Sequence, residues 1–150
     1  MSANTDPIHI RVARPNERDE LEALQWRASL ANDNDRPHLQ AHPDAIQLPI
    51  EQLVRGQVFV AEVEGAIAGF AVVLPERTHA ELDGLFVEPE MWRTGVGAAL
   101  VQAATDEARR LGMTLMVIAN PAARTFYERC GFAFEGEAQT RFGPGIRMSR

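Results

Sequence analysis

The sequence has no lysine, one cysteine and no long apolar run, and each absence excludes a class of protein. All 15 basic residues are arginine while 21 residues are acidic, so the formal net charge is −6. Because no basic cluster is present, we expect no nucleic-acid partner. Cys130 alone cannot form a disulfide within the chain, which suits a reducing compartment and predicts a cytoplasmic location.

Signals for membrane insertion and export are also missing. No apolar stretch approaches the roughly 20 residues that a membrane-spanning helix needs, so we expect no membrane partner. The first seven residues, MSANTDP, lack the basic and apolar regions of a signal peptide. What remains, at 45% hydrophobic and 24% charged, has the composition of a globular protein with a core. We expect one domain over residues 1–150.

The pattern of apolar residues predicts both strands and helices. Apolar or alternating runs predict strands at about residues 8–12, 57–62, 66–74, 80–87, 114–119, 132–136 and 145–149. The sequence predicts a helix after Pro15 with Leu21, Leu24, Ala28 and Ala31 at helical spacing, and a second over about residues 44–55 with Ile46, Ile50, Leu53 and Val54 inward. Two more helices should run from Gly97 to Gly112 and from Asn120 to Gly131.

Two features of this order predict the fold class. Val63-Glu64-Gly65 is a hairpin signal, so the strands around it and the strand at residues 80–87 should be consecutive and antiparallel. The continuously apolar run at residues 114–119 is typical of a strand covered on both faces. Residues 32–43, polar and bounded by prolines, should form a loop. We therefore expect an α/β (α+β) domain with a mixed central sheet of six to seven strands and about four helices.

Residues 80–100 read as strand, glycine loop and helix, an arrangement that binds anions. The loop contains Gly95 and Gly97, and the helix after it would present unpaired backbone amides at the positive end of its dipole. A Walker loop is excluded because it needs a lysine. A dinucleotide fingerprint is excluded because its sixth position, Leu100, is neither Gly nor Ala. It should also follow the first strand of the fold, whereas this loop follows three consecutive antiparallel strands.

Two segments together resemble the GCN5-related N-acetyltransferase (GNAT) superfamily. Residues 85–97, LFVEPEMWRTGVG, are similar to the family's acyl-CoA loop, Gln/Arg-x-x-Gly-x-Gly/Ala after a strand. Residues 120–132, NPAARTFYERCGF, are similar to its Asn-x-x-Ala-x-x-x-Tyr-x-x-x-Gly-Phe signature. Both stand in the family's order within about residues 8–150. In one departure, Trp92 replaces the first Gln or Arg, and Arg93 is the candidate to supply the positive charge instead.

The resemblance implies acetyl-CoA as cofactor and direct transfer of its acetyl group to a primary amine. It also implies that the fourth and fifth strands are parallel and splayed, with the cofactor between them. The pyrophosphate would bind amides of residues 93–98, and the pantetheine would pair with the strand end like an added strand. The implied cofactor-binding residues are Leu85, Phe86, Val87, Arg93, Thr94, Gly95, Val96, Gly97, Ala98, Asn120 and Tyr127.

Three residues are candidates for the two proton transfers. A primary amine is mostly protonated at neutral pH and must lose a proton, and the departing thiolate must gain one. Glu81 and Asp83 lie two apart on a strand, hence on one face, and Glu81 is the first choice as base. Solvated strand carboxylates, or a water relay, would look the same in the sequence. By the resemblance Tyr127 is the general acid, although a core tyrosine would fit its apolar helical face equally well.

The acceptor amine stays unidentified, as a small molecule or a peptide. By the resemblance it would be selected at about residues 26–45 and 136–145, with Trp26, Arg27, His38 and His42 as candidates. The last two have the spacing of a helical metal pair, but the flanking prolines predict a loop, so we expect no metal site. An acyl-CoA-binding sensor without turnover is the alternative function. By analogy with the family we expect a homodimer.

Overall fold

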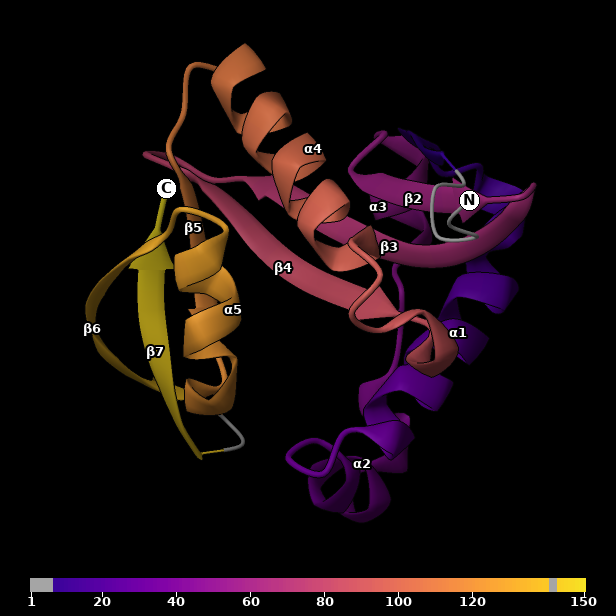
Figure 1. Cartoon of the computed structure of the whole chain (residues 1–150), viewed down its shortest axis with the longest axis horizontal. Coiled ribbons are helices and arrows are strands. Elements are labelled where there is room, and N and C mark those ends of the chain that lie inside the picture. The colour runs from indigo at the N-terminus through magenta and orange to yellow at the C-terminus, as the bar shows by residue number, and fades with distance from the viewer. Residues whose placement is uncertain (1–6, 141–142) are drawn as a thin grey trace, which may run out of the picture.

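A central sheet with helices on both faces forms the frame of the molecule (Figure 1). The structure, a computed structural model, describes residues 7–140 and 143–150. Residues 1–6, where we expect no signal peptide, lie outside the described residues. So do residues 141–142 of the predicted selectivity loop at 136–145.

The described residues form seven strands in one sheet. Its order is β1-β2-β3-β4-β5-β7-β6, and only β4 and β5 are parallel neighbours. The strands are β1 (Ile8–Val12), β2 (Val58–Val63), β3 (Ala66–Pro75), β4 (Ala80–Val87), β5 (Leu115–Ala119), β6 (Ala133–Thr140) and β7 (Gly143–Ser149). The predicted mixed sheet, with its fourth and fifth strands parallel, is confirmed.

Proline marks the entry to most of the helices. In the described chain the α-helices are α1 (Arg18–Ala31), α2 (Arg36–Ala41), α3 (Ile50–Val54), α4 (Val96–Arg110) and α5 (Arg124–Arg129). Short 3-10 turns at Pro15–Glu17, Pro43–Ala45, Pro89–Met91 and Pro121–Ala123 all begin with proline. Proline has no amide proton, and the first turn of a helix leaves that donor unpaired in any case.

Two hydrophobic cores lie on opposite faces of the sheet. On the α4 face, Val73 and Leu82 pack with Leu100 of α4 and with Tyr127 of α5. On the α1 face, buried residues of the strands, of α1 and of α3 pack together: Val58, Val60, Phe70, Val72, Leu21, Leu24 and Leu53. Because successive side chains of a strand point to opposite faces of the sheet, the central strands contribute residues to both cores.

A β-bulge in β4 resets this alternation at Asp83. Val72 of β3 pairs with Gly84, but the next residue, Val73, pairs with Leu82, so Asp83 is the extra residue. As a result Leu82 and Leu85, which are three apart, both pack on the α4 side. Glu81 and Asp83 are left on the other side of the sheet, the α1 face.

The parallel strands β4 and β5 separate almost at once. They pair only at Ala80 with Leu115 and at Glu81 with Met116, although β4 continues to Val87 and β5 to Ala119. Beyond Glu81, the edge of β4 that faces β5 has no strand partner in the described chain. The predicted splay is present, and it opens a gap between the two halves of the sheet.

Three local predictions are wrong, each because of tertiary context or proline. Residues 32–43 contain the helix α2, since Pro37 falls in its first turn, where proline is tolerated. The helix predicted at 44–55 shrinks to α3, because Pro49 holds the preceding chain extended and Leu48 is buried there instead. The α1 face of β5 is uncovered, since Ile118 is 39% exposed.

The shorter α3 also changes which of its residues point inward. Leu53 is buried as predicted, but Val54 is 68% exposed and Ile50 is exposed as well. The extended segment before α3 is held to α1, because the Leu48 amide donates to Glu22 Oε2 at 2.7 Å. No helix in the described part of the chain is long and apolar enough to cross a membrane.

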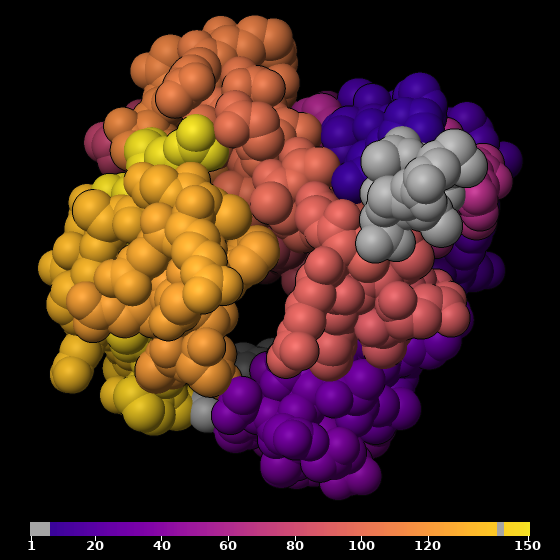
Figure 2. Space-filling model, viewed as in Figure 1, coloured from indigo at the N-terminus to yellow at the C-terminus, as the bar shows by residue number. Residues whose placement is uncertain are grey.

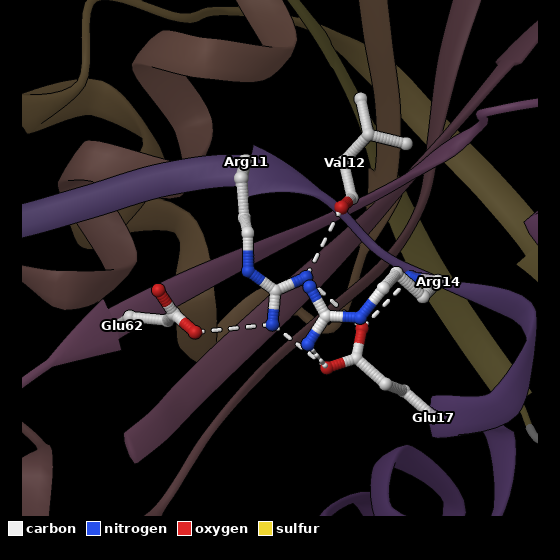
Figure 3. Close-up of polar contacts among 5 residues, drawn as sticks. All are labelled: Arg11, Val12, Arg14, Glu17 and Glu62. Carbon is white, nitrogen blue, oxygen red and sulfur yellow. Dashed lines mark hydrogen bonds and ion pairs between the residues drawn. The ribbon is translucent and has the colours of Figure 1, made fainter. Parts of the chain in front are cut away.

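An ionic cluster joins the end of β1 to the start of α1 (Figure 3). Arg11 donates to both oxygens of the buried Glu17 carboxylate, at 3.0 and 2.7 Å, and to Glu62 on β2 at 3.0 Å. The Arg14 amide adds a bond of 2.7 Å to Glu17. The hydrogen bonds from Arg11 lower the pKa of Glu17 to about 2, so this carboxylate is charged over a wide pH range.

Candidate active site

The gap between β4 and β5 reaches the molecular surface. Figure 2 shows an opening bounded by the orange segment of α5, the salmon segment where β4 leads into α4, and the purple segment of α2. These segments are far apart in the sequence, and the splay of the sheet brings them around one space. The residues predicted for cofactor and acceptor binding can be placed relative to this opening.

The loop before α4 leaves a row of backbone amides unpaired. Arg93 and Gly95 both have positive φ, 66° and 95°, and the Thr94 hydroxyl donates to the Met91 carbonyl at 2.5 Å. Within the described chain, no amide of residues 93–98 has a backbone acceptor outside the helix; the first bonded amide is Ala99, to the Gly95 carbonyl. These donors meet at the positive end of a 15-residue helix, which is an anion-binding geometry.

Trp92 closes this loop against the end of β4. Its indole Nε1 donates to the Val87 carbonyl at 2.9 Å, while the ring is 40% exposed. Trp92 stands where the resemblance expects Gln or Arg, and here the side chain ties the loop to the strand. The neighbouring Arg93 is exposed and forms no ion pair within the described residues.

The first turn of α4 is in close contact with α5. A β-carbon built on Gly97 would lie 3.3 Å from Cζ of Phe126 and 3.8 Å from a methyl group of Val87. A side chain here would have to displace the Phe126 ring, so glycine allows the ring and the helix to approach closely. At Gly95, by contrast, a β-carbon would meet nothing within 4 Å, so the space in front of the loop is open.

The ring of Tyr127 is buried on the α4 face. It packs edge-on against Phe126 and Phe132, with ring centroids 5.0 and 5.3 Å away. Burial, with a smaller effect of Cys130, raises the pKa of Tyr127 well above its ordinary value, so the phenol holds its proton. Its hydroxyl has no hydrogen-bond partner in the described chain. Every fully buried side-chain oxygen among the described residues does have a partner, so the Tyr127 oxygen must reach the surface.

Asn120 acts as the cap that its sequence position suggested. Its side-chain oxygen accepts from the Ala122 amide at 2.9 Å, at the entry to the 3-10 turn before α5. The residue is exposed. This contact accounts for the asparagine as a helix cap, and its side-chain NH2 group donates no hydrogen bond to the described residues.

Glu81 lies in a hollow on the α1 face, at the point where β4 and β5 separate. The hollow has a volume of about 380 Å³ and is lined by Thr78, His79, Glu81, Met116, Ile118, Glu135 and Arg147. His79 Nε2 is 3.4 Å from Glu81 Oε1. The sequence did not point to His79, Glu135 or Arg147, because residues of four strands and a loop meet here only through the sheet order.

Asp83 lies on the same face but in a second, smaller hollow of about 180 Å³. Three glutamines, Gln25, Gln47 and Gln52, line this hollow together with the ring of Phe86. Burial raises the pKa of Asp83, and the charges of Glu81 and Glu76 raise it further. The two carboxylates therefore share a face and influence each other, as predicted from their spacing, but each faces its own hollow.

The four residues predicted to bind the acceptor amine line neither hollow. Arg27 forms a double hydrogen bond with Glu88, at 2.9 and 2.6 Å, which joins α1 to the end of β4. Trp26 is half-buried on α1. His38 is exposed on α2, and His42 follows at the end of that helix.

Comparison with known proteins gives two curated relatives of this chain. An uncharacterized N-acetyltransferase of Methanocaldococcus jannaschii is 32% identical over 85 residues, which is 49% of this chain and 38% of the relative. The uncharacterized N-acetyltransferase YafP of Escherichia coli is 34% identical over 82 residues, 55% of this chain and 49% of the relative. The matches thus span about half or less of each relative's length.

Among solved structures, the PaiA N-acetyltransferase of Thermoplasma acidophilum in complex with coenzyme A has a similar fold. Its TM-score is 0.73 at 18% identity, over 96% of this chain and 98% of that one. The likeness extends over nearly all of both chains, so the two proteins share a fold. The Acetyltransferase (GNAT) family model matches residues 19–132, and on that match the chain belongs to the GNAT acetyltransferase family.

Proposed function

We propose that this protein is an acetyl-CoA-dependent N-acetyltransferase that moves an acetyl group directly to a primary amine of a small molecule or peptide. One observation carries the proposal. The strands β4 and β5 part after two paired residues, beside a row of unpaired amides at the start of α4. This combination suits an elongated ligand with an anionic group at one end.

The donor site would lie in the splay, on the α4 face. Amides of residues 93–98 would hold the pyrophosphate, with Arg93 close by, and residues 85–87 would pair with the pantetheine amides. The open space in front of Gly95 and the unpaired edge of β4 fit such a ligand. Bound acetyl-CoA would supply the thioester, and coenzyme A in the similar PaiA structure supports this assignment.

The acceptor would approach from the α1 face, where both carboxylates lie. Glu81 would take a proton from the ammonium group, so that the free amine can attack the carbonyl carbon of the thioester. After the attack the nitrogen carries a second excess proton, which Glu81, having released the first proton to water, would accept. As the carbon–sulfur bond breaks, the Tyr127 hydroxyl would give its own proton to the departing thiolate and regain one from water. An amide near Leu85, on the free edge of β4, would stabilise the negative charge on the carbonyl oxygen. Asp83 is the alternative base.

We also propose that the protein is a single domain, that it is located in the cytoplasm, and that it forms a homodimer. The single cysteine favours a reducing compartment. The strand β6 is last in the sheet order, so its outer edge is available to a second copy. Size-exclusion chromatography with light scattering would measure the mass in solution, and a monomer at micromolar concentration would contradict the dimer.

Turnover with a panel of amines tests the proposed function. The full chain is incubated with acetyl-CoA and amino acids, polyamines, aminoglycosides or peptides, and acetylated products are detected by mass spectrometry. We expect at least one amine to be acetylated with matching release of CoA. If the released CoA is detected with a thiol reagent, the reagent could also react with Cys130. A blank that contains the protein alone corrects for this background. Tight acetyl-CoA binding with no acetylation of any amine would overturn the proposal and favour a sensor.

A further inference from the structure

The hollow around Glu81 contains a guanidinium group without a partner. Arg147 on β7 is exposed and makes no hydrogen bond or ion pair with any described residue. Neither of the two carboxylates that line the hollow forms an ion pair with Arg147. Glu81 lies beside His79, and Glu135 accepts a hydrogen bond from the Ser149 hydroxyl. A cation therefore faces this hollow with its donors available.

The strand register sets the positions of Glu81 and Arg147. Glu81 pairs with Met116 of β5, and Ile118 of β5 pairs with Arg147. The two side chains thus come from the strands on either side of β5, and the backbones of these strands are roughly 10 Å apart at the normal strand spacing. Their pairing positions are offset by two residues along β5. Between them lie the half-buried Met116 and the partly exposed Ile118, which give the hollow an apolar floor.

We infer that the acceptor amine carries a carboxylate, which Arg147 binds, and is thus an amino acid or a short peptide-like derivative of one. This inference rests on the proposed function. A guanidinium group holds a carboxylate through two parallel hydrogen bonds, a geometry that gives both affinity and orientation. The ammonium group of the same molecule would be directed to Glu81, and an apolar side chain would lie over Met116 and Ile118.

The other amine classes fit this hollow less well. A polyamine would place a second positive charge near Arg147, where like charges repel. A simple alkylamine would fill the apolar floor but leave the guanidinium without a partner. Only an amine that also bears an acid satisfies both kinds of charge that line the hollow.

The first experiment compares amines that differ only in the acid. Leucine, leucinamide and 3-methylbutylamine share the apolar group, and equivalent sets can be made for other amino acids. We expect the acid-bearing member to have the highest kcat/KM in its set. The amine of leucinamide is less basic than that of leucine, so a larger fraction of it is unprotonated at neutral pH. Leucinamide would therefore be the better substrate if the protein did not bind the carboxylate. Equal or better use of the amides or the alkylamines would overturn the inference.

The second experiment changes Arg147. We expect Arg147→Gln to raise the KM for the acid-bearing amine by about 10-fold to 100-fold, the range for a lost hydrogen bond between charged groups. The KM for the matching amide should stay the same, and Arg147→Lys should recover part of the loss. Arg109→Gln, at the exposed end of α4, is the matched control and should change neither value. Equal KM values in Arg147→Gln and the unaltered protein would contradict the assignment.

A binding measurement separates this inference from the proposed function. Calorimetric titration of the protein with leucine and with leucinamide requires no turnover. We expect leucine to bind more tightly, and Arg147→Gln to abolish the difference. If no amine is acetylated, the proposed function fails, while this titration still decides whether Arg147 reads a carboxylate. Equal affinity for acid and amide would overturn the inference on its own.

Discussion

Among single residues, Tyr127 combines an observed packing role in the core with the proposed role of general acid. Its ring is 7% exposed and belongs to the core on the α4 face. The Tyr127 hydroxyl makes no hydrogen bond to any described residue, and burial raises the pKa of Tyr127, so the hydroxyl keeps its proton. A protonated hydroxyl without a protein partner is available as a proton donor, while the raised pKa makes it a weaker acid than an exposed phenol. The packing role and the donor role can be tested separately.

We predict that Tyr127→Phe lowers kcat about 100-fold on an accepted amine, because general acid catalysis is worth at least that factor. The affinity for CoA and the melting temperature should change little, because the phenyl ring keeps the edge contacts with Phe126 and Phe132. Steady-state kinetics and calorimetric titration with CoA measure the two effects. An unchanged kcat would show that Tyr127 only packs the core.

For the base, we predict that Glu81→Gln lowers kcat/KM about 100-fold at neutral pH, with a smaller loss in Asp83→Asn. The loss should shrink as the pH rises, because more of the acceptor is then already deprotonated. Glu137→Gln on the exposed edge strand β6 is the control and should behave like the unaltered protein. If Asp83→Asn proves the more damaging change, Asp83 is the base.

At the scale of elements, the junction of β4 and α4 depends on Gly97. We predict that Gly97→Trp weakens CoA binding at least about 100-fold, because any side chain there enters the space beside Phe126 and the unpaired amides. Gly97→Ala, with only a β-carbon 3.3 Å from the Phe126 ring, should have a smaller effect. Calorimetric titration with CoA measures all three proteins.

The control for this prediction lies on the same helix. Gln102→Trp adds the same bulk to an exposed position of α4, away from its first turn. We expect its CoA affinity to be unchanged, and circular dichroism to show that both variants keep their helices. Equal affinity in Gly97→Trp and Gln102→Trp would place the pyrophosphate elsewhere.

At the scale of the whole molecule, the ionic cluster of Glu17 links the first strand to the first helix and makes stability depend on pH (Figure 3). Since Arg11 lowers the pKa of Glu17 to about 2 from 4.5, this contribution is complete above pH 4.5 and is lost as the pH falls toward 2. The difference between the two pKa values corresponds to at most about 3 kcal/mol.

We therefore predict that Glu17→Gln lowers the free energy of unfolding by about 1–3 kcal/mol at pH 7 and by clearly less at pH 3. Urea unfolding at both pH values measures the difference. Glu51→Gln on α3 is the control, because this exposed carboxylate forms no ion pair within the described residues. An equal penalty for Glu17→Gln at both pH values would mean that its charge does not matter.

Local patterns were sufficient where a residue's own neighbours decide its structure. Alternating apolar residues located the strands, and the two glycines after β4 located the row of unpaired amides at α4. Patterns failed where proline or an uncovered face decided the outcome. The helix α2 formed despite Pro37, and the apolar run of β5 suggested two covered faces although one lines a hollow.

The family, the mixed sheet and the anion-binding loop could be predicted from the sequence alone, because each depends on short motifs and on the order of elements along the chain. That His79, Glu135 and Arg147 share a hollow with Glu81 is seen only in the folded protein. These residues lie on strands that are neighbours in the sheet but distant in the sequence, so no local spacing relates them. The bulge at Asp83 likewise depends on the pairing of β4 with β3, which placed the two carboxylates in separate hollows on one face.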